Sequence, residues 1–174
     1  MPLQKGYVQV YTGDGKGKTT AAFGLALRAV GAGLKVYIGQ FIKGMHYAEL
    51  DAFQRFEELV TIKQFGSGCF IHGDPTQEDI NLAQDGLREL KDIVIAGNHD
   101  MVILDEANVA VFFGLFTAQD LLDLIDAKPE HVELVFTGRR APQELIDRAD
   151  LITEMRDIKH YYTQGVLARC GIEN

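Results

Sequence analysis

Residues 12–20, Thr-Gly-Asp-Gly-Lys-Gly-Lys-Thr-Thr, are of the types that bind a polyphosphate. Their three glycines lack a Cβ, so the backbone can fold over an anion with its N–H groups pointing inward. A helical pattern follows directly, and the free N–H groups and positive dipole end of a helix N-terminus attract phosphate as well. We therefore expect a phosphate-binding loop, with Lys18 reaching a phosphate oxygen and the Thr19 hydroxyl reaching Mg²⁺.

The stretch is close to the P-loop signature, but Thr12 stands where that signature has its first glycine. The alternative is a glycine-rich turn with a surface lysine. An apolar strand pattern before the loop and a helical pattern after it favour the P-loop. The residues expected to contact the nucleotide are Gly13, Asp14, Gly15, Lys16, Gly17, Lys18, Thr19 and Thr20.

Two later strand ends carry further chemistry. Four apolar residues, 101–104, run straight into Asp105 and Glu106, and an acid at such a position can hold Mg²⁺ directly or through water. We expect Thr19, Asp105 and Glu106 to be the metal ligands. The next strand leads into residues 137–140, where Arg139 can contact phosphate in a planar, bidentate way. Lys18 and Arg139 are therefore the expected catalytic residues, whereas Arg140 is as well explained by solvent exposure.

The elements that must position these residues alternate between strand and helix. Strands are expected in residues 6–11, 34–41, 60–65, 101–104, 131–136 and 150–155, and helices in 21–30, 48–59, 76–97, 117–128 and 142–149. This order predicts an α/β fold: a mainly parallel sheet with helices on both faces, in a P-loop NTPase (RecA-like) architecture. The whole chain, 1–174, is expected to form one domain.

Some segments give weaker indications. Residues 42–47, which include Lys43, follow a buried strand and are a candidate wall of the site. His99 follows the helix terminator Gly97 and is expected to be a solvated turn residue. Residues 107–115 are apolar without an assigned element, and 156–174 show no period.

Composition excludes several classes of protein. The chain has 17 basic and 25 acidic residues, a net charge of −8, and no long basic cluster, which disfavours nucleic acid as a partner. No run of 18 apolar residues is present, and the N-terminus has no signal-peptide pattern, so we expect no membrane association and a cytoplasmic protein. The two cysteines do not form a Cys-x-x-Cys pair, so neither a disulfide framework nor a cysteine-rich metal site is expected.

Six segments in order resemble the P-loop family of ATP:corrinoid adenosyltransferases, and they cover nearly the whole chain. The segments are residues 12–24, Leu-Asp-Glu-Ala-Asn at 104–108, Phe-Thr-Gly-Arg at 136–139, Ala-Asp-Leu-Ile-Thr-Glu-Met at 149–155, Lys-His at 159–160 and 165–172. The resemblance implies transfer of the 5′-deoxyadenosyl group of ATP to the cobalt(I) of a reduced corrinoid, with triphosphate leaving. It also implies ATP bound in the reversed direction, Mg²⁺, an electron donor such as a flavoprotein, and a homodimer.

The chain departs from that family in the loop after the third strand, residues 66–75. Relatives carry corrinoid-facing aromatic residues there, including a tryptophan, whereas this chain has no tryptophan and places Cys69, Phe70 and Ile71 in the loop. Phe70 is the expected corrinoid contact, and its insertion into the core is the alternative. The chain also begins almost at its first strand, which implies a more open site or one closed by a partner subunit.

Two other functions are compatible with the same motifs. One is a RecA-like ATPase or phosphotransferase, which would release phosphate or diphosphate in place of triphosphate. The other is a nucleotide- or corrinoid-binding protein without turnover, which would bind its ligands and form no product.

Overall fold

The computed structural model describes residues 3–68, 71 and 73–173, so Cys69 and Phe70 lie outside the described residues. Six parallel strands form one sheet in the order β3-β2-β4-β5-β1-β6. The strands are β1 (Val8–Thr12), β2 (Val36–Phe41), β3 (Val60–Phe65), β4 (Met101–Asp105), β5 (Glu133–Thr137) and β6 (Leu151–Glu154). The helices are α1 (Lys18–Gly31), α2 (Ala48–Gln54), α3 (Gln77–Ala96), α4 (Ala107–Phe112), α5 (Ala118–Ala127), α6 (Gln143–Arg148) and the 3₁₀ helix η1 (Tyr161–Gln164).

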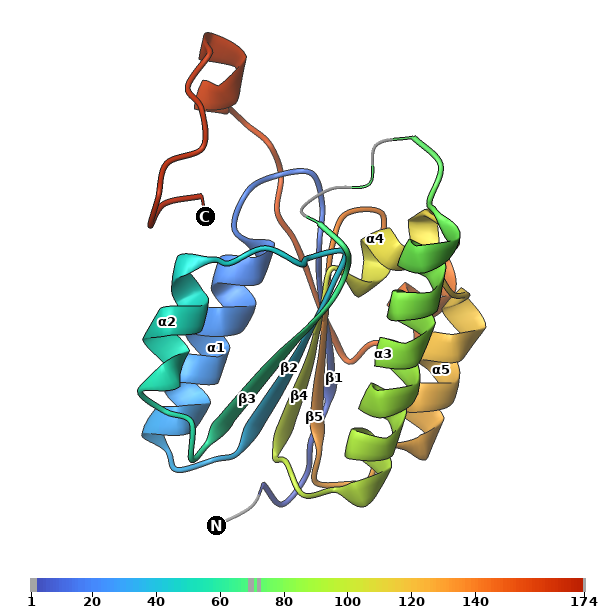
Figure 1. The fold of residues 1–174 in the computed structure, drawn as a ribbon. Coiled ribbons are helices and arrows are strands. Elements are labelled where there is room, and N and C mark those ends of the chain that lie inside the picture. Colours follow the sequence, from blue (N-terminus) through green and yellow to red (C-terminus); the bar gives the residue numbers. More distant parts are fainter. Residues whose placement is uncertain (1–2, 69–70, 72, 174) are drawn as a thin grey trace.

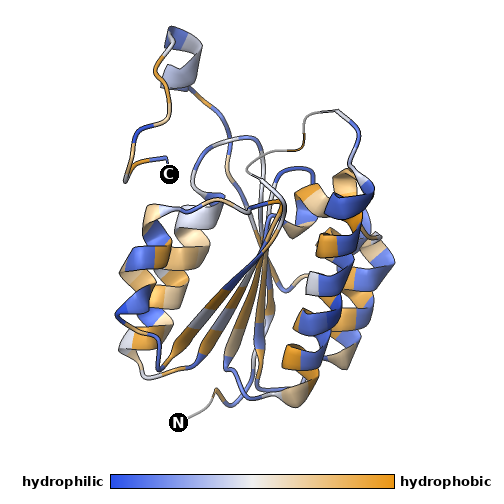
Figure 2. Ribbon diagram, in the orientation of Figure 1, coloured by the Kyte–Doolittle hydropathy of each residue, from blue (hydrophilic) through white to orange (hydrophobic). Residues whose placement is uncertain are grey.

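Helices cover both faces of the sheet, as the sequence predicted. Helices α1 and α2 lie on one face, and α3 and α5 lie on the other (Figure 1). The central strands β2, β4 and β5 are buried at every position and are mostly apolar, with their polar residues at or near the strand ends (Figure 2). Such strands are typical of parallel sheets that are covered on both sides.

Several helix ends follow the chemistry that the sequence indicated. Thr76 and Thr117 each form a capping box, in which the threonine side chain accepts from the N–H of the third helical residue, Asp79 or Asp120. Helix α3 ends at Gly97, whose φ of 62° is the left-handed conformation that glycine adopts at low cost. The three predicted ends are therefore confirmed.

Three local expectations were wrong or incomplete. Helix α2 ends at Gln54 because the chain turns there, with the N–H of Phe56 bonded to the carbonyl of Phe53. The apolar segment after β4 contains the six-residue helix α4, which is too short to show a period. His99 is half-buried, with its ring 5.4 Å from that of Tyr37 and its Nδ1 buried without a partner in the described part of the chain, so it is not a solvated turn residue.

The parallel arrangement brings the carboxyl ends of all six strands to one edge of the sheet. The loops after β1, β2, β3 and β5 and the C-terminal tail gather at this edge, which is uppermost in Figure 1. Ligands of open α/β sheets bind at this edge. None of the helices within the described ranges is long and apolar enough to cross a membrane.

Candidate functional site

A row of polar side chains crosses three neighbouring strands at the carboxyl edge. Gln40 on β2 is the registered partner of Asp105 on β4, and Thr137 ends the adjacent β5. Side chains alternate along a strand, and Met101 and Ile103 of β4 pack with α1. Asp105 is next in this series and therefore points to the face where α1 begins.

Asp105 is the centre of a buried hydrogen-bond network. Its Oδ1 accepts from the hydroxyls of Thr19 at 2.8 Å and Thr137 at 2.7 Å. Its Oδ2 accepts from Lys43 Nζ at 2.8 Å and Gln40 Nε2 at 3.2 Å. With 0% of its surface exposed, this carboxylate is satisfied entirely by protein groups.

The charges of this network hold one another in place. Burial alone would raise the pKa of Asp105, but the ammonium of Lys43 and the hydroxyl donors outweigh it and lower that pKa. Burial likewise opposes the charge on Lys43, but Asp105 raises the pKa of Lys43 above its ordinary value. The two groups therefore form an ion pair at the sheet edge.

The pKa of Glu106, the second acid of the pair, shifts in the opposite direction to that of Asp105. Burial and the neighbouring charge of Asp105 raise its pKa. Its φ of 60° turns the chain from β4 into α4, and its N–H donates to the Thr137 hydroxyl at 2.9 Å. The pKa values of the two adjacent acids therefore shift in opposite directions.

The glycine-rich loop ends at Gly17, which precedes α1 with a φ of 119°. Lys18 is buried, and its Nζ donates to the carbonyls of Gly13 at 2.8 Å and Gly15 at 2.7 Å. Burial lowers the pKa of Lys18. Helix α1 has no side-chain cap and no acid in its first turn among the described residues, so its terminal N–H groups and dipole favour an anion.

The chain that follows β6 presses on this loop. The N–H of Gly15 donates to the carbonyl of Met155 at 2.7 Å. A Cβ at Gly13 would lie 2.4 Å from that carbonyl oxygen, and one at Gly15 would lie 2.8 Å from the carbonyl of Arg156. Glycine is therefore required at both positions by close backbone packing.

The two arginines after β5 differ in their surroundings. Arg139 lies near enough to the loop for its charge to add to the effect of burial in lowering the pKa of Lys18, and to oppose in part the raised pKa of Glu106. Arg140 instead lies with its guanidinium carbon 4.0 Å from the ring centroid of Phe112.

The structure thus brings together several of the residues proposed from the sequence and separates others. Lys18, Thr19 and the two acids converge at the N-terminus of α1, with Arg139 exposed beside them. The Lys16 side chain points away to the C-terminal tail, and Asp14 lines a shallow surface pocket with residues 154 and 156–158. Thr20 lies in the first turn of α1, and Phe70 lies outside the described residues.

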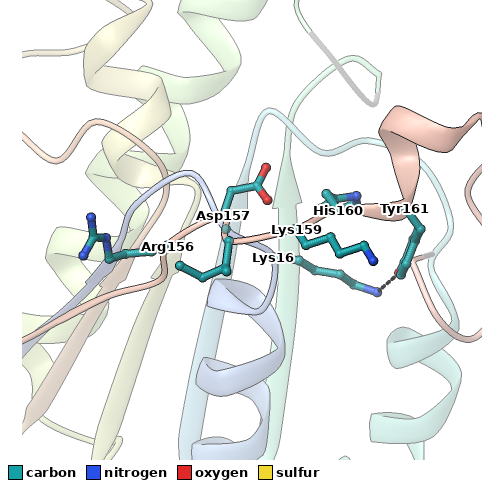
Figure 3. Close-up of a pocket in the computed structure, with 8 residues that line it drawn as sticks. Lys16, Arg156, Asp157, Lys159, His160 and Tyr161 are labelled. Atoms are coloured by element: carbon teal, nitrogen blue, oxygen red, sulfur yellow. Dashed lines mark hydrogen bonds between the residues drawn. The ribbon is translucent and has the colours of Figure 1, made fainter.

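Sequence reasoning missed Gln40 and Thr137, and it expected Lys43 only as part of a site wall. Strand alternation could have identified the first two, because both stand in the register of the buried apolar side chains that face α1. It also missed a pocket where residues 156–161 pass over Gly15 and Lys16 (Figure 3). Lys16, Arg156, Lys159 and His160 line this pocket together with one acid, Asp157.

Comparisons with known proteins agree with this geometry. The sequence pattern of the family described as ATP:corrinoid adenosyltransferase BtuR/CobO/CobP matches residues 4–174. The chain is 36% identical over 171 residues to a corrinoid adenosyltransferase of Pseudomonas aeruginosa, covering 98% of this chain and 84% of the relative. It is 34% identical over 175 residues to the corrinoid adenosyltransferase CobA of Salmonella typhimurium, covering 98% and 86%.

A solved structure supports the fold. A KaiC-like protein from Pyrococcus horikoshii superposes with a TM-score of 0.56 at 17% identity, covering 87% of this chain and 74% of that protein. At this identity the likeness bears on the fold alone, an α/β fold built on a parallel sheet. The family match extends over nearly the whole chain, and the chain therefore belongs to the ATP:corrinoid adenosyltransferase family.

Proposed function

We propose that this protein transfers the 5′-deoxyadenosyl group of ATP to the cobalt of a reduced corrinoid and releases triphosphate. The observation that carries the proposal is membership of the family over residues 4–174. Cobalt(I) donates the electron pair of the new cobalt–carbon bond. The bond between C5′ and the phosphate oxygen breaks, and its electrons leave with the triphosphate. Because cobalt is the nucleophile, the protein has to position the substrates and stabilise the leaving charge.

In this proposal the leaving triphosphate lies on the loop of residues 13–17 and the N-terminus of α1. The Lys18 ammonium already donates to the carbonyls of Gly13 and Gly15, at 2.8 and 2.7 Å. Its side chain is therefore ordered beside the loop before a ligand binds. Arg139 is exposed and free to turn toward an added phosphate. Both positive charges would stabilise the negative charge that develops on the triphosphate oxygen as its bond to C5′ breaks.

The residue types are those that bind magnesium, and a bound ion would take the place of the hydrogen bonds that Thr19 and Lys43 donate to Asp105. Thr19 and Asp105 present oxygen atoms 2.8 Å apart, with Glu106 next in the chain, and Mg²⁺ is held by one or two carboxylates together with phosphates and water. We propose that these three residues hold it. A bound Mg²⁺ would neutralise charge on the departing triphosphate.

Other expectations stay proposals. The family supports a reduced corrinoid as the second substrate, and an electron donor such as a flavoprotein would be needed to produce cobalt(I). We also propose a cytoplasmic homodimer. Phe70 stays the proposed corrinoid contact, and the neighbouring Ile71 packs against the core cluster that α3 and α5 share.

A RecA-like ATPase or phosphotransferase is compatible with the same loop and with Asp105 and Glu106, although family membership favours the adenosyltransferase. The products separate the two functions. ATP and chemically reduced cobalamin are incubated with the purified protein, and the light-sensitive cobalt–carbon bond and the released phosphates are measured. We expect equal amounts of adenosylated corrinoid and triphosphate. Release of phosphate or diphosphate without a cobalt–carbon bond would instead identify the ATPase or phosphotransferase.

A further inference from the structure

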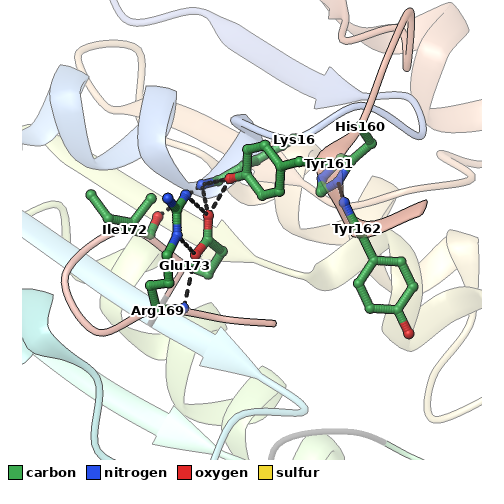
Figure 4. A network of polar contacts seen from close by, with 7 residues as sticks. All are labelled: Lys16, His160, Tyr161, Tyr162, Arg169, Ile172 and Glu173. Atoms are coloured by element: carbon green, nitrogen blue, oxygen red, sulfur yellow. Dashed lines mark hydrogen bonds and ion pairs between the residues drawn. The ribbon is translucent and has the colours of Figure 1, made fainter. Parts of the chain in front are cut away.

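Lys16 belongs to the phosphate-binding loop, but its side chain points to the C-terminal tail and is hydrogen-bonded there. An ammonium has three N–H donors. Those of Lys16 are accepted by the Tyr161 hydroxyl at 3.2 Å, the Ile172 carbonyl at 2.9 Å and Glu173 Oε1 at 2.9 Å (Figure 4). Every partner of this ammonium therefore lies in residues 161–173.

Glu173 is the acceptor on which this network converges. Its Oε1 accepts from Lys16, from the Tyr161 hydroxyl and from Arg169 Nη2 at 3.1 Å. Its Oε2 accepts from the backbone N–H of Arg169 at 2.9 Å and from Nε of the same residue at 3.2 Å. These donors lower the pKa of Glu173, so the carboxylate is ionised across the physiological range.

The network is better shielded than an ordinary surface ion pair. The side chain of Glu173 is 17% exposed and that of Lys16 is 38% exposed. The guanidinium of Arg169 also lies 5.0 Å from the ring centroid of Tyr161, which stiffens the aromatic residue that contacts Lys16. A carboxylate held by two cations and a hydroxyl gives the tail one defined position.

The tail consequently holds the loop at two points. At one, Met155 accepts the N–H of Gly15 at 2.7 Å. At the other, Glu173 fixes the side chain of Lys16, the next residue in the chain. A loop with three glycines has much conformational freedom to lose when it binds an anion, and attachments at Gly15 and Lys16 remove part of that cost in advance.

We propose that Glu173 is a positioning residue: through Lys16 it holds the tail against the phosphate-binding loop and so preorganises the loop for the triphosphate. This inference rests on the proposed function for the identity of the ligand. Glu173 acts on the affinity for the polyphosphate and not on the corrinoid. In this proposal the side chain of Lys16 contributes through its contact with the tail, and the orientation of its backbone N–H is set by the loop.

The test uses the full chain and four variants: Glu173→Gln, Lys16→Met, the double variant, and Glu58→Gln as a control. Glu58 is an exposed acid in the turn between α2 and the start of β3, so its substitution removes the same charge at the edge of the sheet opposite the loop. Calorimetry with magnesium and inorganic tripolyphosphate measures loop affinity without any turnover. We expect Glu173→Gln and Lys16→Met each to bind about threefold to tenfold more weakly, as suits a partly shielded charge pair. The control should match the wild type.

Three further readouts separate positioning from general destabilisation. The double variant should bind no more weakly than the weaker single variant, because each substitution breaks the same link. The KM for ATP should rise by the same factor as the tripolyphosphate Kd, with the corrinoid KM unchanged. Trypsin should cleave after Arg156, Lys159 and Arg169 faster in Glu173→Gln, while the thermal midpoint stays that of the wild type.

Wild-type tripolyphosphate affinity in Glu173→Gln would overturn the proposal. Tighter binding would overturn it too, because the carboxylate would then compete with phosphate for Lys16. If Glu173→Gln lowers the thermal midpoint, Lys16→Met gives the same test without altering the tail. A wild-type protein that forms no cobalt–carbon bond, but whose Glu173→Gln variant binds tripolyphosphate weakly, would refute the proposed function and support this inference.

Discussion

Replacing Lys43 by methionine should expose the energetic balance at the centre of the site. The substitution keeps the length of the side chain and removes the ammonium that lies 2.8 Å from Asp105. The side chain of Lys43 is 13% exposed and that of Asp105 is 0% exposed, so the pair is buried. Removing one partner of such a pair leaves a buried charge without its compensation.

The expected cost follows from what stays around Asp105. Breaking a buried ion pair typically costs ~3–5 kcal/mol. Three hydrogen-bond donors, from Thr19, Gln40 and Thr137, still reach the carboxylate, so the lower end of that range applies. A loss of ~3 kcal/mol lowers the thermal midpoint by roughly 6–12 °C in a chain of this size.

Lys63→Met is the matched control. Lys63 also pairs with a carboxylate, that of Glu89, but the two side chains are 52% and 36% exposed. An exposed pair is worth less than ~1 kcal/mol, so this control should lose only a few degrees. Urea and thermal unfolding of both variants measure the difference, with and without magnesium and ATP.

The metal provides a second arm of the same experiment. If Mg²⁺ is held beside Asp105, this divalent cation supplies the positive charge that Lys43→Met removed. The difference in unfolding stability between the variant and the wild type should therefore become smaller when magnesium and ATP are added. A Lys43→Met protein as stable as Lys63→Met would refute the argument from burial. A gap that magnesium and ATP leave unchanged would refute Asp105 as part of the metal site.

Three other predictions concern single groups. Lys18→Ala should lower kcat/KM by about 100- to 1,000-fold with the fold retained, and wild-type kinetics would remove Lys18 from the site. A chelator should abolish turnover and added Mg²⁺ should restore it, so full activity in chelator would exclude a metal role for Thr19 and the acids. Burial lowers the pKa of His99, so stability that needs its neutral form is present above about pH 6.5 and lost as the pH falls. The free energy of unfolding of His99→Phe, measured in urea, should therefore rise relative to that of the wild type as the pH falls from about 7.5 to about 5.5. A difference that does not change with pH would contradict this.

Local patterns account for how much of the fold could be predicted. Apolar runs placed the strands, and the capping threonines and Gly97 marked helix ends because those signals act within four residues. Helix α4 has only six residues, fewer than two turns, so no period could reveal it. His99 resembled a turn residue because burial against Tyr37 depends on a strand distant in the sequence.

The site residues likewise fall into those that a local pattern identifies and those that only the fold brings together. Thr19 and Asp105 were predicted because each lies next to a motif or a strand end. Gln40 and Thr137 were missed although their register was readable, since polar residues inside buried strands were not counted as site residues. The contact between Lys16 and Glu173 spans 157 positions of sequence and joins a motif to a tail without a period, so only the folded chain reveals it.

The strand order also determines when the nucleotide loop can mature during synthesis. Strand β1 is the first strand made, yet its two neighbours, β5 and β6, are the last two. At ~5–20 residues per second, β1 therefore waits on the order of ten seconds for its first partner. The loop that follows β1 also needs its hydrogen bond to Met155. In nascent chains interrupted before β6, strands β2, β3 and β4 should therefore be paired while this loop is not yet formed. Competence to bind nucleotide is thus acquired only after β6 and Met155 have been made, as one event.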